Sequence, residues 1–315
     1  MIHNVVGISG GKDSTALGLL AIEKQTENLK FVFADTGHEH SETYEYVEYL
    51  SEEFKARCGV GITTVRADFA DRIEAKRQRI AVEWPEAGIS QDRVDAALAV
   101  MKPTGNAFLD MCLWKGVFPS TRRRWCTEVL KHKPMEDQVQ NPILQSGCQA
   151  LINWQGVRAD ESKARAHLKM HDVEFGQWDP EPQGHLIYRP IIKWNVKDVF
   201  AMHRKHGLKP NPLYKKGMYR VGCMPCIHSR KAELRAIAKN YPEVFEHLAF
   251  MERTVNLVCK NNATTFFHTD KTPGVGDARS HAMAVKEWAT GGNQMDLIEM
   301  FEGAPSCSSV YGLCE

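Results

Sequence analysis

The feature that most constrains the fold of this chain is a short glycine-containing stretch close to its start. It reads Ser9-Gly10-Gly11-Lys12-Asp13-Ser14. An apolar run at residues 5–8 precedes it, and a helix-like segment at residues 15–22 follows it. A strand that turns through glycines into a helix leaves unpaired backbone N–H groups at the positive end of the helix dipole, where they bind anions. The pattern therefore predicts a phosphate-binding loop in an α/β protein.

The side chains of this loop add to the prediction. Lys12 supplies a positive charge, and Ser9 and Ser14 supply hydroxyl donors. Asp13 is an unusual neighbour for a phosphate and indicates a bridging Mg²⁺. The Walker A pattern does not fit, because it requires Ser or Thr directly after Lys12 and a glycine at the position of Val6.

Composition sets the broad class. The chain has 315 residues, of which 43% are hydrophobic and 25% charged, so we expect a globular protein with one large domain and additions, or two domains. The apolar start is too short for a signal peptide or a membrane span and lacks a basic leader, which predicts a cytoplasmic protein without a membrane partner. The net charge of +1 leaves nucleic acid open as a partner, and Arg122, Arg123 and Arg124 form a local basic cluster.

The order of apolar segments predicts a doubly wound, mainly parallel sheet of about five strands. Strand-like runs at residues 29–35 and 62–65 flank an amphipathic helix at residues 41–57. Ligands sit at the carboxyl ends of parallel strands, so Asp35, Thr36 and Gly37 should lie beside the phosphate loop. We expect one domain over residues 1–235, with an insertion of helices and loops at about 70–120, and a C-terminal helical region with a cysteine-containing tail at 236–315.

The nine cysteines indicate metal chemistry. Their number is odd and no secretory signal precedes them, so structural disulfides are not expected. Cys223 and Cys226 have the C-x-x-C spacing that presents two thiolates to one metal centre, and Cys126 would supply a third. A fourth ligand could come from the tail, as Cys314 or as Cys307. Four thiolates bind either a [4Fe–4S] cluster or zinc, and spacing does not separate the two.

Several motifs resemble known families. The Ser-Gly-Gly-Lys-Asp-Ser loop resembles the PP-loop of the ATP pyrophosphatases. A second set, in order along the chain, resembles the phosphoadenosine-phosphosulfate (PAPS) reductase family: Asp35-Thr36-Gly37, the element with Gly156, Arg158 and Arg165, and Gly222-Cys223-Met224-Pro225-Cys226. The resemblance covers over half of the chain and implies the adenine nucleotide α-hydrolase-like fold.

The resemblance also implies roles for these residues. Asp35, Thr36 and Gly37 would line the nucleotide pocket, Gly156 would approach the nucleotide, and Arg158 and Arg165 would face phosphate or sulfate. It favours the iron–sulfur cluster over zinc. Iron–sulfur members carry a Cys-Cys pair where this chain has Trp125-Cys126, so one family ligand is missing here.

A complete PP-loop combined with the Gly-Cys-x-Pro-Cys element is similar to the ATP pyrophosphatase component of DNA phosphorothioation systems. In the implied reaction, ATP adenylylates an acceptor, with a DNA backbone phosphate favoured, and pyrophosphate is released. Sulfur from a cysteine desulfurase or another donor then displaces AMP. Lys12, Asp13 and Ser14 would be catalytic, ATP and Mg²⁺ would be bound at the loop, and Arg122, Arg123 and Arg124 would contact nucleic acid.

Two alternatives stay open at this point. One is a PAPS or adenylyl-sulfate reductase that produces sulfite. The other is a non-catalytic ATP-binding subunit with structural zinc. The sequence leaves the oligomeric state open.

Overall fold

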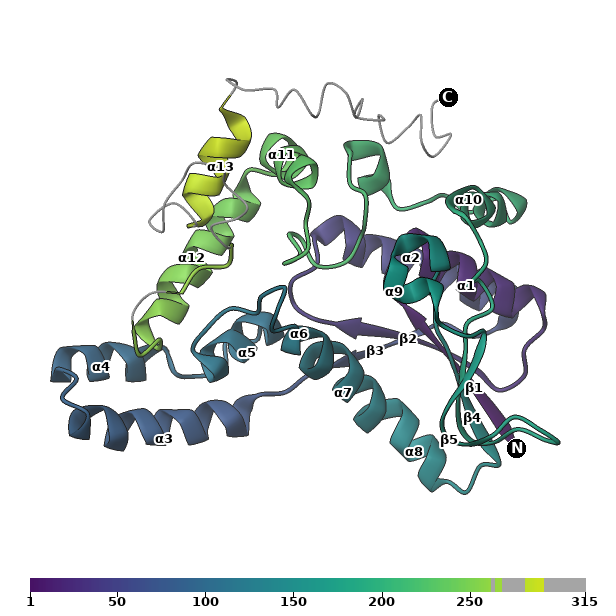
Figure 1. The fold of residues 1–315 in the computed structure, drawn as a ribbon, viewed down its shortest axis with the longest axis horizontal. Helices are drawn as coiled ribbons and strands as arrows, with labels where there is room; N and C mark the ends of the chain where they lie inside the picture. Colours follow the sequence, from purple (N-terminus) through teal and green to yellow (C-terminus); the bar gives the residue numbers. More distant parts are fainter. Residues whose placement is uncertain (262–263, 268–280, 292–315) are drawn as a thin grey trace.

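The computed structural model describes residues 1–261, 264–267 and 281–291. A six-stranded sheet with the order β3-β2-β1-β4-β6-β5 lies at its centre (Figure 1). Five strands are parallel, and β5 runs antiparallel to β6. The strands are β1 (Ile2–Ile8), β2 (Leu29–Asp35), β3 (Ile62–Arg66), β4 (Ala150–Trp154), β5 (His171–Gln177) and β6 (Gln183–Tyr188). The predicted doubly wound, mainly parallel α/β fold is confirmed.

Helices make up most of the remaining described chain. The α-helices are α1 (Lys12–Glu23), α2 (Ser41–Cys58), α3 (Ala70–Glu86), α4 (Gln91–Val100), α5 (Ala107–Lys115), α6 (Trp125–Thr127), α7 (Lys133–Met135), α8 (Asn141–Gln145), α9 (Lys163–Ala166), α10 (Val196–Lys205), α11 (Lys231–Asn240), α12 (Glu243–Leu257) and α13 (Ala282–Thr290). The short π-helices η1 (Glu128–His132) and η2 (Glu136–Gln140) join α6, α7 and α8 into one helical run, and η3 (Ala159–Glu161) and η4 (Pro212–Lys216) are 3₁₀ turns. Among the described helices, none has both the length and the apolar character needed to cross a membrane.

Alternating residues of the strands bury the two faces of the sheet against different helices. Val6 and Phe31 pack with Leu17 of α1 and Val199 of α10 on one face. Val5 and Val32 pack with Val139 and Ile143 of the α6–α8 run on the other. Successive side chains of a strand point to opposite faces, so neighbouring valines in β1 serve two different cores.

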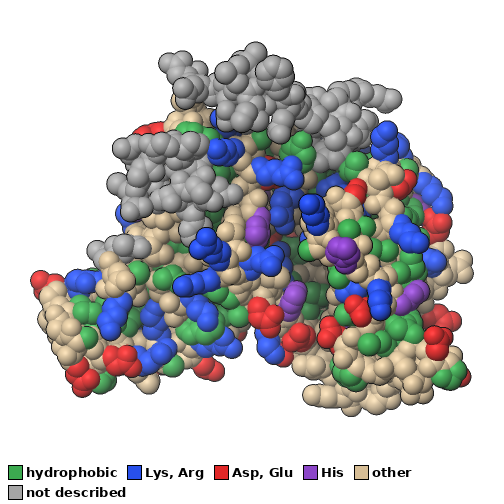
Figure 2. All heavy atoms as spheres, in the orientation of Figure 1, with side chains coloured by type: hydrophobic (Ala, Val, Ile, Leu, Met, Phe, Trp, Pro, Cys, Tyr) green, Lys and Arg blue, Asp and Glu red, His purple; other side chains and the backbone are tan. Residues whose placement is uncertain are grey.

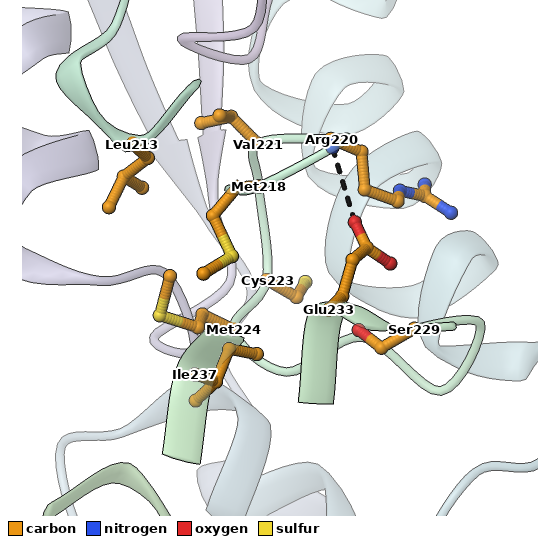
Figure 3. Close-up of a pocket in the computed structure, with 10 residues that line it drawn as sticks. Leu213, Met218, Arg220, Val221, Cys223, Met224, Ser229, Glu233 and Ile237 are labelled. Atoms are coloured by element: carbon orange, nitrogen blue, oxygen red, sulfur yellow. Dashed lines mark hydrogen bonds between the residues drawn. The ribbon is translucent and has the colours of Figure 1, made fainter. Parts of the chain in front are cut away.

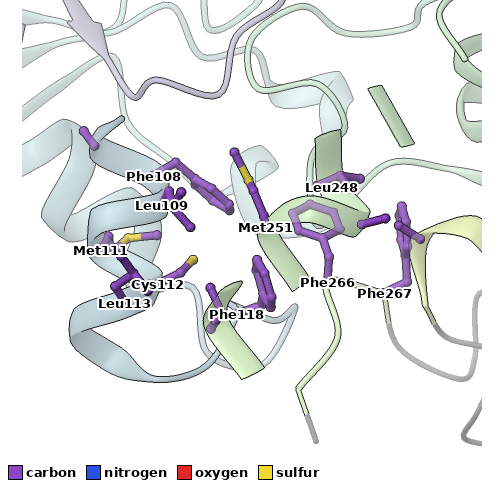
Figure 4. Close-up of a cluster of buried hydrophobic side chains, with 14 of the residues drawn as sticks. Phe108, Leu109, Met111, Cys112, Leu113, Phe118, Leu248, Met251, Phe266 and Phe267 are labelled. Atoms are coloured by element: carbon purple, nitrogen blue, oxygen red, sulfur yellow. The ribbon is translucent and has the colours of Figure 1, made fainter. Parts of the chain in front are cut away.

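The remaining helices form a lobe beside the sheet. Its core joins α3–α5 to α11, α12 and α13. Figure 4 shows Phe108 and Met111 of α5 on one side of this core and Met251 of α12 with Phe266 on the other. The insertion expected at about 70–120 is therefore helical, and it shares a buried core with the C-terminal helices.

Two strand predictions need correction. β5 is absent from the sequence-based expectation because nearly every residue in it is exposed, so no buried apolar pattern marks it. The apolar run at residues 188–194 predicts a further strand from the sequence, but β6 ends at Tyr188 and the chain turns at residues 190–193. Pro190, which has no backbone N–H to donate, follows the strand end closely.

Candidate nucleotide and cysteine site

The hexapeptide at residues 9–14 forms a tight loop between β1 and α1. Gly10 has a φ of +71°, a conformation that favours glycine, and Gly11 is the N-cap of α1. The Ser14 hydroxyl accepts the Ser9 N–H at 3.0 Å and donates to the Gly11 carbonyl at 3.0 Å. The two serines therefore brace the loop, and α1 presents its N-terminus at the carboxyl edge of the sheet.

Three side chains from a distant part of the chain hold the backbone of this loop. His203 of α10 lies 2.9 Å from the Lys12 carbonyl, and Asn211 donates to the Gly10 carbonyl at 3.2 Å. The Tyr214 hydroxyl accepts the Lys12 N–H at 2.9 Å. Each of the three residues is 1% exposed. The sequence analysis gave no role in the loop to these residues, although Asn211-Pro212-Leu213-Tyr214 is a recognisable pattern.

His203 has a defined proton arrangement. The Lys12 carbonyl can only accept a hydrogen bond, so the Nε2 atom of His203 carries the proton. Burial lowers the pKa of this imidazole. A neutral His203 therefore serves the loop as a hydrogen-bond donor without adding charge.

Asp13 is paired with a buried guanidinium. Its carboxylate accepts from Arg158 Nε at 2.6 Å and lies 3.3 Å from Lys12 Nζ. Arg158 is 5% exposed and also pairs with Asp160. Burial opposes the charge on Arg158, but the neighbouring carboxylates outweigh it, and the pKa of Arg158 is raised. The ion pair with Arg158 therefore fixes the position of the Asp13 carboxylate in the loop.

The other residues of that element lie differently. A Cβ at Gly156 would stand 3.4 Å from the Ser14 backbone, so the close approach at this glycine is to the loop itself. Arg165 is half-buried and forms an ion pair with Glu161.

The end of β2 forms a network of carboxylates and hydroxyls. Asp35 accepts from the Gly37 N–H at 2.8 Å and from the Tyr44 hydroxyl at 2.7 Å. Burial and the two carboxylates Glu39 and Asp35 raise the pKa of Tyr44, so it remains a donor. Thr36 is fully buried, and its hydroxyl donates to Glu39 at 2.8 Å and lies 3.5 Å from the Cys223 sulfur. This network links the strand end to the cysteines.

Cys126, Cys223 and Cys226 line one pocket with a volume of about 90 Å³. Phe108, Leu130, Ile227 and Phe266 form an apolar part of its wall. Lys131, Arg220 and His228 add basic side chains to the same wall, and sequence reasoning overlooked all three. Lys131 stands only five positions after Cys126, so the clustering of basic residues around that cysteine was the available signal.

The turn that carries two of these cysteines is braced by α11. Figure 3 shows Glu233 of α11 reaching the backbone of Arg220, whose N–H it accepts at 3.2 Å. Glu233 also accepts the Arg230 N–H at 2.9 Å and is 2% exposed. Burial raises the pKa of Cys223 to about 12, partly offset by Lys131, so without a metal this thiol is protonated at neutral pH.

The fit of a metal to this pocket depends on the donor set. Among the described residues, no group of three or more His, Cys, Asp or Glu side chains is arranged to hold a single metal ion. Cys126, Cys223 and Cys226 share the lining of one pocket, and a centre with four thiolate ligands would need one more. Cys307 and Cys314 lie outside the described residues.

The remaining predicted residues are also placed. Arg122, Arg123 and Arg124 are exposed in the turn before α6. The apolar or helical neighbours of Cys58, Cys112 and Cys259 predict packing roles; Cys112 and Cys259 are indeed buried, whereas Cys58 is exposed.

One segment connects the two halves of the site. Residues 211–226 contact the phosphate loop through Asn211 and Tyr214 and supply Cys223 and Cys226 to the pocket. Glu39, which follows β2, forms a bridge to Cys223. The loop and the cysteine pocket are thus parts of one continuous structure.

An open parallel sheet with an anion-binding loop at the carboxyl end of β1 defines a nucleotide-binding α/β protein of the PP-loop type. The comparison with known families is more specific: the chain belongs to the phosphoadenosine phosphosulfate reductase domain family, which it matches over residues 3–229. The family and the fold indicate an enzyme of the PAPS reductase and PP-loop type.

Individual relatives show the range of similarity. An uncharacterized 37.8 kDa protein of Escherichia phage 186 is 44% identical, with 99% of this chain and 96% of that protein covered. An adenosine 5'-phosphosulfate reductase of Anoxybacillus flavithermus is 26% identical, with 65% of each chain covered. A phosphate complex of the PAPS reductase of Candida auris shares 16% identity over 71% of this chain and 82% of that one, with a TM-score of 0.39.

Proposed function

We propose that this protein is an ATP pyrophosphatase that adenylylates an acceptor, a nucleic acid with a DNA backbone phosphate favoured, for sulfur insertion. The observation that carries the proposal is the segment at residues 211–226, which contacts a complete phosphate loop at one end and brings two cysteines to a shared pocket at the other. An enzyme that activates an oxygen with ATP and replaces it with sulfur needs these two functions side by side.

The intact loop favours ATP over an already adenylylated sulfate. Sulfonucleotide reductases bind no β,γ-diphosphate, and the family resemblance associates them with loss of the full pyrophosphatase loop. Here both serines and both glycines are present, and His203, Asn211 and Tyr214 hold the loop closed. A PAPS or adenylyl-sulfate reductase is the second candidate, because family membership supports it equally.

The residues of the loop have separable roles in this proposal. The backbone N–H groups at the start of α1 and the Lys12 ammonium would stabilise negative charge on the departing pyrophosphate. Asp13 would hold Mg²⁺, which supplies charge neutralisation between the phosphates. Arg158 already contacts one Asp13 oxygen and Lys12 the other, so these two cations fix the orientation of the carboxylate. Ser14 braces the loop geometry, and Asp35, Thr36, Gly37, Gly156 and Arg165 would complete the nucleotide site.

The cysteine pocket would hold the sulfur chemistry. Cys126, Cys223 and Cys226 would be three ligands of a [4Fe–4S] cluster, with Cys314, or else Cys307, as the fourth. Three cysteines that line one pocket fit either a cluster or zinc, and the resemblance to the iron–sulfur members favours the cluster. A cysteine desulfurase or a similar donor would deliver the sulfur.

The test is pyrophosphate release from ATP and Mg²⁺ by anaerobically purified protein, with and without DNA, RNA and a sulfur donor. We expect release by the wild type and its loss in Asp13→Ala, while Asp71→Ala, an exposed aspartate on α3, keeps it. Sulfite formation from PAPS or adenylyl sulfate with a thiol, without pyrophosphate release, would establish the reductase instead. A colourless protein with neither activity would support the ATP-binding subunit with zinc.

A further inference from the structure

A cluster of basic side chains held on tryptophan rings lies next to the cysteine pocket. The Lys115 ammonium is 3.8 Å from the ring centroid of Trp114 and 5.7 Å from that of Trp125. The Arg72 guanidinium is 4.3 Å from the Trp114 centroid. Residues from α3, from α5 and from the start of α6 therefore meet at one surface. We call the set of Arg72, Lys115, Arg122, Arg123 and Arg124 the basic surface.

The basic surface carries charge that the described chain does not neutralise. None of its five members forms an ion pair with a carboxylate among the described residues. Arg72, Lys115 and the three arginines are all exposed. Like charges repel, but each cation–π contact offsets part of that repulsion and fixes the head group. The rings hold Arg72 and Lys115, and a group of cations without carboxylate partners is suited to an extended polyanion.

The basic surface continues into the cysteine pocket. Trp125 is followed directly by Cys126, whose side chain lines the pocket, and Lys131 and Arg220 extend the basic lining. Figure 2 shows Lys and Arg side chains above the hollow at the centre of the view, and Asp and Glu side chains along its lower side. A polyanion on the basic surface would therefore be led to the sulfurs.

The depth of the pocket decides which polyanion fits. Cys126, Cys223 and Cys226 are half-buried behind Phe108, Leu130 and Phe266. A duplex is too wide to bring one of its groups to recessed sulfurs, whereas a single strand can turn one nucleotide inward. Basic side chains interspersed with aromatic rings are typical of single-strand binding.

We propose that the basic surface binds single-stranded nucleic acid and brings one nucleotide of it to the opening of the cysteine pocket. This inference rests on the proposed function, because it names the form of the acceptor. The phosphates would lie on Arg72, Lys115 and the three arginines, and the acceptor nucleotide would face the opening, with the cysteines and the centre that they hold behind it.

The experiment measures binding without ATP, by fluorescence anisotropy of labelled single-stranded DNA, single-stranded RNA and duplex DNA over a range of salt concentrations, with polyglutamate as an acidic competitor. We compare wild type with the triple variant Arg72→Ala/Lys115→Ala/Arg123→Ala. The control is Lys24→Ala/Lys30→Ala/Lys55→Ala, which removes three exposed charges at the start of β2 and at the ends of the helices that lead into β2 and β3. A second variant, Arg122→Ala/Arg123→Ala/Arg124→Ala, changes only exposed residues of one turn and guards against misfolding.

We expect the wild type to bind single strands tightly. In the first variant the affinity for single strands should fall by at least about 10-fold, and the slope of log K against log salt should become shallower by about 2, because three phosphate contacts are lost. The inference would be overturned if the test variants bound single strands as tightly as the control variant does. It would also be overturned if duplex DNA bound as tightly as single strands, or if polyglutamate displaced the labelled strand as well as unlabelled single strands do. Pyrophosphate release is measured on the same samples. If the wild-type protein binds single strands but releases no pyrophosphate from ATP, the proposed function alone is refuted. If it releases pyrophosphate but binds no single strands, this inference alone is refuted.

Discussion

Replacing Tyr214 with Phe removes the hydroxyl that accepts the Lys12 N–H at 2.9 Å and leaves the ring in place. Tyr214 is 1% exposed, so water does not readily take the place of the hydroxyl. The N–H belongs to the first residue of α1, which is the group that a phosphate would engage. In the absence of nucleotide, Tyr214→Phe therefore leaves a buried donor without this partner.

The expected change in the free energy of unfolding follows from the lost hydrogen bond to the Lys12 N–H. An unsatisfied buried N–H lowers the free energy of unfolding by about 1–3 kcal/mol. When a phosphate oxygen accepts the same N–H, the loss disappears from the complex. The variant should then bind ATP more tightly than the wild type, by about 5- to 150-fold for 1–3 kcal/mol. Asn211→Ala removes a donor to the Gly10 carbonyl, which no phosphate replaces, so it should lower stability with and without ATP.

Two measurements test this reasoning. Urea unfolding with and without ATP and Mg²⁺ gives the stability of both states, and titration calorimetry gives the ATP affinity. The expected result is a large stability loss for Tyr214→Phe in the free protein and a small one in the complex. Weaker ATP binding by this variant would show that the hydroxyl donates to the nucleotide, and would refute the idea that it holds the N–H in place of a phosphate.

Two further predictions concern His203 and the cysteines. Burial lowers the pKa of His203 below its ordinary 6.5, so on acidification below 6.5 the unfolded chain takes up a proton that the native imidazole does not, and stability falls. In urea unfolding between about pH 5 and pH 7, His203→Gln should make the free energy of unfolding less dependent on pH, whereas His167→Gln, at an exposed position, should not. An unchanged pH dependence in His203→Gln would contradict a buried, neutral His203. Cys126→Ala, Cys223→Ala and Cys226→Ala should each abolish bound iron and sulfide in anaerobically purified protein, whereas Cys148→Ala, which packs against the sheet, should retain them. Full metal content in Cys126→Ala, by elemental analysis, would remove this residue from the ligand set.

The parts of the fold that could be predicted are those with a local signal. β1, β2 and β4 contain buried apolar runs, and the loop after β1 lies within six consecutive residues. β5 gave no signal, because it pairs at the edge of the sheet and exposes almost all its side chains. Its position depends on pairing with β6, which is a tertiary contact.

The same distinction applies to the site. Lys12 and Asp13 could be read from a motif, but the partner of the Lys12 N–H lies 202 positions away, and the arginine that pairs with Asp13 lies 145 positions away. Arg158 belonged to a recognisable element, so its presence in the site could be anticipated, but not its contact with Asp13. His203 stands in an ordinary amphipathic helix, where a buried histidine has no pattern of its own.

The shared core of the helical lobe sets an order for events during synthesis. All six strands have been made once residue 188 is complete, but the lobe joins residues 69–130 to helices that extend to residue 290. The sheet can therefore assemble while α12 and α13 are still inside the ribosome, and the lobe closes only afterwards. Phe108 and Phe266, which wall the cysteine pocket, come from the two parts of the lobe and meet only at that stage. A metal centre in this pocket would thus be inserted only after most of the chain has been synthesised, and the Cys126 thiol would be exposed to solvent until then.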